Sequence, residues 1–373
     1  MADDYPQIVD LSTLTGVFQA GQFMAIGVEG EKDAEGTATV ALPELVRNAE
    51  EANTLFGAGS PLALLVKFIL ARGISYVWAV CSASAIPPTL VERQTAWVAL
   101  EENEDIRIRL TDSTTQADLV ALAESCEWAE GIQHKQFCFV ALGGASVKAV
   151  ALAAATAISS KRAVLMSPHV YDNEGVLLDG AFDAALAACE VAKNPDIVDS
   201  LNGAVVPATS GIEVQASTGL PIYRLRAGAG TPVNDHQDLL DGGVSTYQQD
   251  RSGQAALTHL RMAYTTDDTF DALTTLLIKD EVFLGLRTML KDQKFLRMPN
   301  NANNRSLAAK LVDQWLKAHS DWVEPVGLPD GTDGYGVSVV EAEDHKSFTV
   351  AYQGQVVRGT NVININGTLT IPV

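Results

Sequence analysis

Histidine and cysteine are the side chains in this sequence best suited to bind a metal ion or to move a proton near neutral pH. No two of the six histidines stand at the HxH, HxxxH or HExxH spacing that places two ligands on one helix face. The four cysteines show no CxxC or Cys/His ligand spacing. The sequence therefore predicts no metal site, and instead surface or structural histidines and buried thiols. These residues are His134, His169, His236, His259, His319, His345, Cys81, Cys126, Cys138 and Cys189.

Serine hydroxyls are the next candidates for chemistry, because a serine beside a histidine and an acid can act as a nucleophile. Ser146, Ser167 and Ser210 can be paired with His169 or His236, and aspartate is abundant. No GxSxG elbow is present, however, and paired acids identify nothing in so acidic a chain. We therefore predict no catalytic residue, and an α/β enzyme of unknown substrate is kept only as an alternative.

Residues 143–146, Gly-Gly-Ala-Ser, follow an expected strand and open an expected helix. Backbone amides in such a turn can bind an anion. The full GxGxxG pattern and the lysine of a P-loop are both missing. An ordinary connection with Ser146 as helix N-cap is the favoured interpretation, and no cofactor is predicted.

Alternating strands and helices are expected to position these groups. Apolar runs and helical periods follow one another through the first two thirds of the chain, which is typical of parallel strands with right-handed crossovers. We predict an α/β domain over residues 21–250. Its expected strands are 23–28, 74–81, 106–110, 136–142 and 164–167, and its expected helices are 43–57, 60–73, 116–128, 146–158 and 180–193.

The pattern changes near residue 257, where long helices and short strands replace the alternation. A strand is expected at 258–265, helices at 270–290 and 306–319, and further strands at 335–340 and 347–351. This succession of long helices and short strands predicts a second domain of α+β class over residues 251–355.

Both ends of the chain are predicted to be extended arms, residues 1–20 and 356–373. The C-terminal arm is rich in strand formers with no obvious partner in its own chain. Asn366 and Gly367 could fold it into a small hairpin, or it could stay extended and complete a sheet locally or in a neighbouring subunit. On the residues alone, completion of the local sheet is favoured.

Composition limits the partners. The 373 residues carry a formal net charge of −20, which disfavours nucleic acid and anionic membranes. The N-terminus lacks the features of a signal peptide, and the apolar stretches are too short to span a bilayer, so we expect no secretion and no transmembrane segment.

Positive charge is concentrated in one place on this acidic chain. Residues 1–250 hold 14 Lys and Arg against 32 Asp and Glu, whereas residues 251–373 hold 12 against 14. Within 285–319 the balance reverses to seven bases against two acids. A docking face for an anionic partner and an ordinary solvated helix face explain this equally well. The bases are Arg287, Lys291, Lys294, Arg297, Arg305, Lys310 and Lys317.

Two stretches resemble a known family. Residues 55–63, LFGAGSPLA, precede a helix and the strand 77–80, VWAV. Residues 239–245, LLDGGVS, precede residues 260–267 and a long helix that leads to a basic stretch. This order resembles the contractile tail sheath proteins of phages, especially the Mu-like group.

The resemblance implies a structural subunit and not an enzyme. Sheath subunits form stacked hexameric rings, a helical polymer, around a tail tube and contract to drive it through the host envelope. The α/β domain would face outward and the second domain would face the tube. The implied partners are further copies of the chain, the tube protein, and baseplate and tail terminator proteins. The implied location is the virion, after assembly in the host cytoplasm. A non-contractile virion structural protein is the other alternative.

The resemblance also implies roles for the arms and for the basic stretch. Arms that exchange strands between subunits would favour donation of the tail over local completion. The implied exchange residues are Ile8, Val9, Val362, Ile363, Ile365, Leu369 and Ile371, and the implied tube-docking residues are Arg297, Arg305, Lys310 and Lys317.

Overall fold

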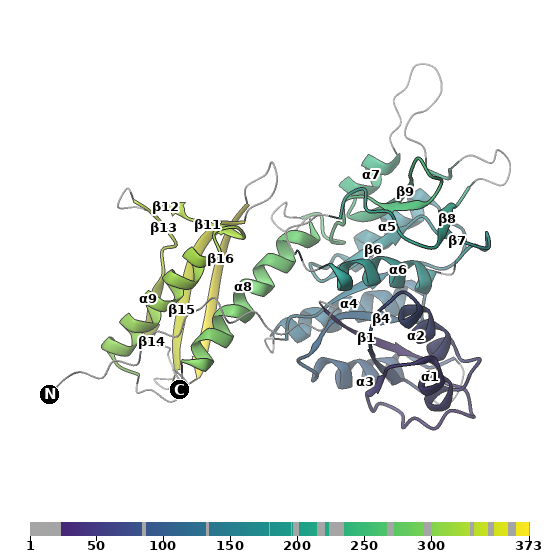
Figure 1. The fold of residues 1–373 in the computed structure, drawn as a ribbon, viewed down its shortest axis with the longest axis horizontal. Coiled ribbons are helices and arrows are strands. Elements are labelled where there is room, and N and C mark those ends of the chain that lie inside the picture. Colours follow the sequence, from purple (N-terminus) through teal and green to yellow (C-terminus); the bar gives the residue numbers. More distant parts are fainter. Residues whose placement is uncertain are drawn as a thin grey trace, which may run out of the picture.

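A computed structural model shows two lobes joined by a long helix (Figure 1). It describes residues 24–83, 87–131, 134–178, 180–194, 196, 201–214, 221–223, 235–266, 272–293, 300–328, 332–341, 347–356 and 363–372, with the backbone alone at 347, 348, 356 and 363–372. The predicted arm at 1–20 lies outside these residues.

The large lobe is built on an eight-stranded sheet in the order β10-β9-β6-β5-β4-β1-β3-β2. The six inner strands are parallel, and β2 and β10 pair antiparallel at the two edges. The strands are β1 (Ala25–Gly30), β2 (Glu44–Val46), β3 (Val77–Cys81), β4 (Ile106–Thr111), β5 (Phe137–Val140), β6 (Ala163–Ser167), β9 (Val244–Gln249) and β10 (Ala255–Leu257). The predicted α/β class is confirmed, and β10 carries the large sheet beyond residue 250.

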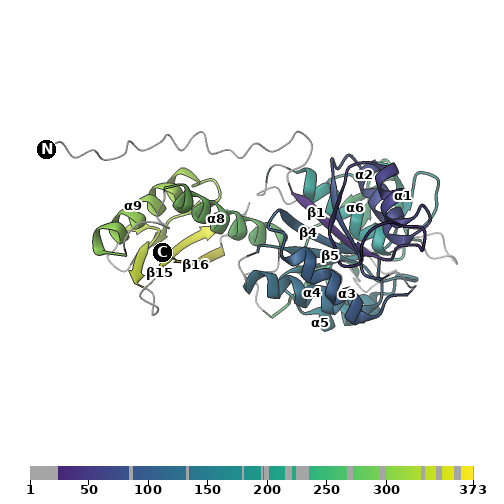
Figure 2. The same cartoon turned by 90° about the horizontal axis from the view of Figure 1, so that it is seen from below.

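Helices cover both faces of this sheet, so its strands are apolar on both sides. On β5, Phe137 and Phe139 pack into one core, whereas Cys138 and Val140 pack into the other. The first face is covered by α1 (Ala49–Phe56), α2 (Pro61–Ala71) and α6 (Gly180–Lys193), and the second by α3 (Leu90–Glu101), α4 (Gln116–Gly131), α5 (Lys148–Ile158) and α7 (Asp235–Asp241) (Figure 2). Two short strands, β7 (Val170–Asp172) and β8 (Thr209–Ile212), pair antiparallel as a separate small sheet.

Helix α2 forms where its end signals predict it. The Ser60 hydroxyl accepts a hydrogen bond from the Ala63 amide at 3.1 Å, and Pro61 is the first helical residue. Gly73 follows the helix with a φ of 89°, in the left-handed region that favours glycine. The observed helix therefore matches the one predicted between Ser60 and Gly73.

Two local predictions are wrong, and one helix was not predicted. Pro43 does not start a helix, because Glu44–Val46 pairs with the edge strand β3 and the helix begins after Asn48. The strand expected at 258–265 is absent, since that stretch makes only isolated backbone bonds to the large sheet after β10 ends. Helix α3 was not predicted, although Thr89 and Glu92 form a complete capping box at its start.

The small lobe packs two helices against an antiparallel sheet (Figure 1). On β15, one edge is paired with β16 along its whole length, and the other is shared by β14 and β11. The elements are α8 (Leu273–Asp292), α9 (Ala302–Ala318), β11 (Val323–Glu324), β12 (Val326–Gly327), β13 (Asp333–Gly334), β14 (Ser338–Glu341), β15 (Ser347–Val356) and β16 (Ile363–Pro372). The predicted helices and the predicted α+β mixture of helices and antiparallel strands are found here.

Helices α8 and α9 approach closely because of one glycine. A Cβ atom added to Gly285 on α8 would lie 2.3 Å from Cζ2 of Trp315 on α9. Trp315 is buried and stacks on His319 with ring centroids 3.8 Å apart. The missing side chain at Gly285 therefore makes room for the indole that joins the two helices.

Candidate functional site

The arrangement around His169 resembles part of a catalytic triad but cannot act as one. Nδ1 of His169 bonds the Asp183 carboxylate, as in a triad, yet Nε2 bonds the Gly144 carbonyl oxygen at 2.5 Å. Both partners accept only, so both ring nitrogens must carry a proton. Burial works to lower the pKa of His169, but the bond to Asp183 raises it overall. An imidazolium with both protons committed has no lone pair with which to activate a nucleophile.

The three candidate serines are also committed elsewhere. The Ser146 hydroxyl accepts from the His169 backbone amide at 3.1 Å, and Ser167 bonds the Tyr223 hydroxyl at 2.6 Å. The Ser210 hydroxyl donates to a backbone carbonyl. The ring of the other candidate, His236, bonds the Thr246 hydroxyl at 3.2 Å. Among the described residues, none of the predicted serine and histidine pairs forms a nucleophile with its base.

The turn at 143–146 holds a carboxylate of the protein itself. The Ser146 amide donates to the Glu213 carboxylate at 3.2 Å, which is the interaction a bound anion would make. Helix α5 begins only after Val147 and has no side-chain cap, so the prediction of Ser146 as N-cap is wrong. The neighbouring cavity of about 30 Å³ has room for about one water molecule.

The ligand crevice typical of a doubly wound sheet is filled by an ion cluster. Such sheets bind ligands at the carboxyl ends of their strands, where the strand order reverses. Here that point lies beside β1, which pairs with β3 on one side and β4 on the other. Nη1 of Arg93, from α3, lies 2.8 Å from Glu29 Oε1 and 2.7 Å from Asp112 Oδ1. Trp97 and Thr111 also donate to Glu29, so the crevice is occupied by side chains.

This cluster predicts a pH effect on stability. Burial, reinforced by the Asp112 carboxylate, raises the pKa of Glu29 from 4.5 to about 7. Between these values the folded chain holds a proton that the unfolded chain has lost, so the free energy of unfolding falls as pH rises. We expect a slope of up to about 1.4 kcal/mol per pH unit from this group. Urea titrations from pH 4.5 to 7 should show it in the wild type and a flatter profile in Glu29→Gln. Equal slopes would contradict this assignment.

Metal and membrane sites are not found in the described part of the chain. No group of three or more His, Cys, Asp and Glu side chains there is arranged to hold a metal ion. No described helix combines the length and apolar character needed to cross a membrane.

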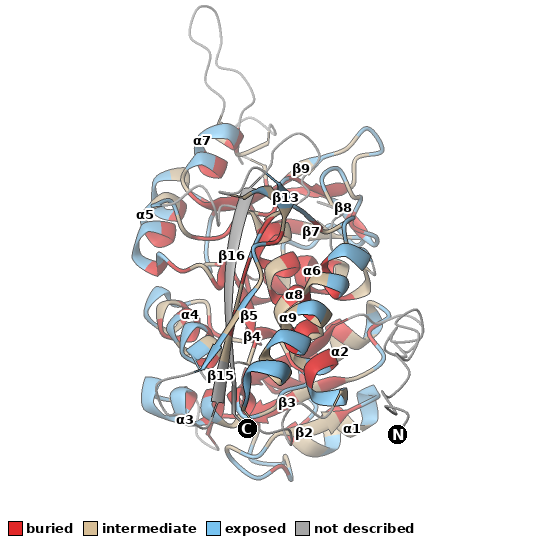
Figure 3. Cartoon of the chain, turned by 90° about the vertical axis from the view of Figure 1, so that its left-hand side faces the viewer, coloured by how far each residue is buried: buried red, intermediate tan, exposed pale blue. Residues whose placement is uncertain are grey.

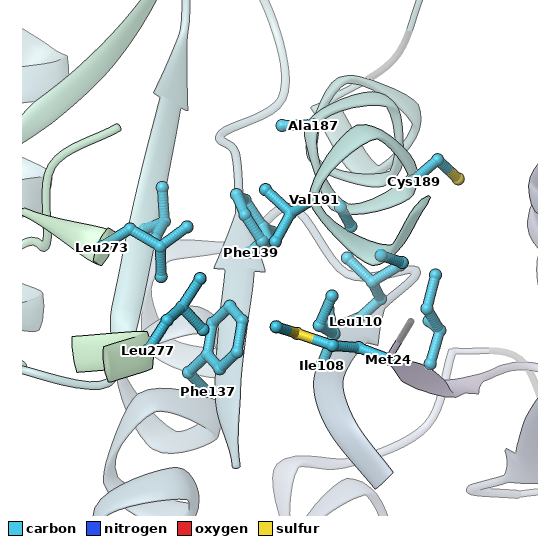
Figure 4. Close-up of a cluster of buried hydrophobic side chains, with 14 of the residues drawn as sticks. Met24, Ile108, Leu110, Phe137, Phe139, Ala187, Cys189, Val191, Leu273 and Leu277 are labelled. Carbon is cyan, nitrogen blue, oxygen red and sulfur yellow. The ribbon is translucent and has the colours of Figure 1, made fainter. Parts of the chain in front are cut away.

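Helix α8 is anchored in the large lobe by a buried ion pair that the sequence analysis missed. Arg162, just before β6, donates through both terminal nitrogens to Asp280, with Nη2 2.9 Å from Oδ1, and also pairs with Glu130 at 2.7 Å. Arg162 and Asp280 are both fully buried. Leu273 and Leu277, on the first turns of α8, pack beside Phe137 (Figure 4). The first half of α8 therefore belongs to the large lobe and its second half to the small one.

Three of the predicted docking residues, Arg305, Lys310 and Lys317, lie on α9, whose outer side is exposed (Figure 3). Arg305 is half-buried, paired with Glu341 at 3.3 Å, whereas Lys317 is exposed and paired with Asp313 at 2.7 Å. Lys310 is exposed, and no ion pair involves it among the described residues. Arg297 lies outside the described residues. Lys310 and Lys317 thus share an exposed stripe with Leu307, which is 43% exposed.

The C-terminal tail completes a sheet in its own chain, as the residues alone predicted, whereas the resemblance implied donation to another subunit. Strand β16 pairs antiparallel with β15 over ten residues, from Ile363 opposite Val356 to Pro372 opposite Ser347. Asn366 and Gly367 lie within this strand, so they make no hairpin turn. Within the described residues, the second edge of β16 has no strand beside it. Ile363, Ile365, Leu369 and Ile371 lie on this edge strand, while Ile8, Val9 and Val362 lie outside the described residues.

Comparisons with known proteins identify the fold. A scan of protein-family models and a search of curated proteins found no match to this sequence. Among solved structures, the sheath tail protein of Listeria innocua matches with a TM-score of 0.68 and 10% identity, over 95% of this chain and 96% of that one. The sheath tail protein of Desulfitobacterium hafniense matches with a TM-score of 0.65 and 11% identity, over 95% and 98%. The helical sheath of the anti-feeding prophage in its contracted state gives 0.61 and 11%, over 97% and 96%.

Proposed function

We infer the role of this chain from its fold, which is that of the tail sheath proteins, and from the length over which the fold matches. We propose that it is the structural subunit of a contractile sheath of a phage tail or a related injection particle. The observation that carries this is the extent of the match, because both lobes and the connecting helix are covered, at 95% or more of each chain. A shared catalytic domain alone would not produce that coverage.

In this proposal the subunits polymerise as stacked hexameric rings around a tail tube and contract to drive the tube through an envelope. Residues 21–250, together with β10 and the first half of α8, form the outer domain, the rest of 251–355 forms the tube-facing domain, and 1–20 and 356–373 form the linking arms. Baseplate and tail terminator proteins lie at the two ends of the polymer. The polymer assembles in the host cytoplasm and becomes part of the virion. The occupied crevice at Arg93 and the imidazolium at His169 support a structural role over a catalytic one.

Strand exchange is proposed at the tail. The second edge of β16 offers backbone groups to a strand from a neighbouring subunit, and β15 offers the same to a neighbour's tail when its own is withdrawn. Backbone pairing of this kind can survive rotation of the bodies that it links, whereas side-chain contacts between lobes break and form again. The exchange residues remain Ile8, Val9, Val362, Ile363, Ile365, Leu369 and Ile371.

Tube docking is proposed at the exposed stripe of α9, and its test is charge reversal. Lys310→Glu should weaken binding to isolated tail tubes roughly tenfold at low salt, with a smaller loss at high salt, because exposed charges are screened. Arg305→Glu and Lys317→Glu should cost less, since a neighbouring acid already offsets each charge. The measurement is co-sedimentation with tubes over a range of salt.

The matched control is Arg251→Glu, an exposed base in a turn of the large lobe. It makes the same charge change away from α9, so tube binding should be unaltered. If Lys310→Glu and Arg251→Glu bind tubes equally well at every salt concentration, the α9 stripe is not the docking surface. Polymer formation without tubes is measured separately, so a loss of docking is distinguished from a loss of assembly.

A further inference from the structure

Helices α3 and α4 run side by side on the second face of the large sheet (Figure 2). Their side chains leave a groove between them. The groove has a volume of about 560 Å³. It lies on the large lobe, on elements that neither the α9 stripe nor the tail involves. Its lining includes Leu90 and Gln94 from α3 and Ala117, Val120, Ala121 and Glu124 from α4.

Exposed apolar side chains extend the groove along both helices. Val98 follows Gln94 by one helical turn and is 47% exposed, and Trp128 follows Glu124 by one turn and is 57% exposed. The small Ala117 in the groove would let another backbone approach closely. Exposed apolar side chains that gather beside a groove are typical of an interaction surface.

The charge on these two helices is almost entirely negative. Together they contain six acids, Glu92, Glu101, Asp118, Glu124, Glu127 and Glu130, and a single base, Arg93. Arg93 is buried and committed to Glu29 and Asp112, so it does not offset the exposed acids. Three of the acids, Glu92, Glu124 and Glu127, are exposed. Glu92 caps the start of α3, and Glu127 accepts hydrogen bonds from the Ser160 hydroxyl and the Lys161 amide, whereas Glu124 lines the groove. The groove is therefore apolar, with the Glu124 carboxylate at its rim.

We propose that this groove binds a cationic amphipathic helix of another protein. The apolar face of that helix packs on Val120 and Trp128, and a lysine or arginine side chain of it pairs with Glu124. Charge complementarity selects this occupant: an anionic membrane, a nucleic acid or an acidic helix would be repelled by the same rim. The interaction is separate from tube docking and does not depend on the sheath assignment.

Synthetic peptides test this on the full-length protein. The probe is a fluorescent helix with leucine at i, i+3, i+4 and i+7 and lysine elsewhere, followed by fluorescence anisotropy. One control peptide has the same composition with the leucines scrambled, and a second has glutamate in place of lysine. The amphipathic cationic peptide should bind at least about tenfold more tightly than either control, because both the apolar stripe and the charge are required.

Two protein variants locate the binding. Ala117→Arg fills the groove at an exposed helical position, and Glu124→Lys reverses its rim, so each should weaken binding about tenfold or more. Val176→Arg, at a position 55% exposed outside the groove, is the matched control and should bind like the wild type. Thermal unfolding of each variant checks that the fold is kept.

Three outcomes would overturn the proposal: no binding of the cationic peptide, equal binding of a control peptide, or unchanged binding to Ala117→Arg. If Ala117→Arg instead abolishes self-association of the protein while the peptide does not compete with it, the groove binds a second copy of this chain.

Discussion

Replacement of Asp280 by alanine is expected to lower the free energy of unfolding by about 3–5 kcal/mol, because it leaves the buried Arg162 without its main partner. Arg162 and Asp280 are both fully buried and share two hydrogen bonds. Glu130 would still pair with Arg162, through Nε and Nη2 of the guanidinium. The measurement is urea unfolding of the intact chain.

The adjacent residue supplies the control. Glu281 lies on the same helix and pairs with Arg107 at 2.6 Å, but both side chains retain some contact with solvent. Glu281→Ala should therefore cost only about 1 kcal/mol. Equal losses for the two variants would show that burial of the Arg162 pair does not anchor α8 in the large lobe.

Removal of residues 357–373 is expected to abolish assembly into long polymers while leaving the large lobe folded. The change deletes β16, so β15 loses its ten-residue partner and any neighbour loses a donated strand. Electron microscopy measures the polymers, and circular dichroism and proteolysis measure the fold. If the shortened chain still forms normal polymers, the tail does not link subunits.

A peptide control separates linkage from local folding. A synthetic peptide of residues 357–373, added to the shortened chain, should bind beside β15 and restore the stability of the small lobe. It should not restore polymers, because a free peptide is not tethered to a second subunit. Recovery of polymers on addition of the peptide would mean that the tail acts only by completing its own sheet.

Local signals predicted much of the large lobe. The Ser60, Pro61 and Gly73 signals gave α2, and the long apolar periods gave α6 over the observed residues. Predictions were wrong where pairing with a strand distant in the sequence determines the local structure. Residues 44–46 join β3 as a strand despite Pro43. The hairpin at Asn366 and Gly367, which the sequence left open, does not form, because β15 aligns with all of β16. A hairpin signal two residues long cannot compete with a ten-residue ladder.

The polar clusters could not be assembled from sequence spacing. Glu29, Arg93 and Asp112 come from β1, α3 and the end of β4, and only the sheet order brings them together. One signal was present for a similar group: Arg109, within strand β4, whose other residues are mostly apolar, needs a buried acid as partner, and it lies 3.6 Å from Glu101. For the exposed stripe of α9, the sequence showed the excess of basic residues. It did not show which of these side chains are exposed.

The central claim is that this chain polymerises into a sheath. Negative-stain electron microscopy of the purified full-length protein tests it most directly. The account predicts wide tubes with cogwheel-like ends and stacked rings of sixfold symmetry. Small discrete particles at every protein concentration and salt condition would contradict it, as would thin smooth tubes, which indicate a non-contractile structural protein.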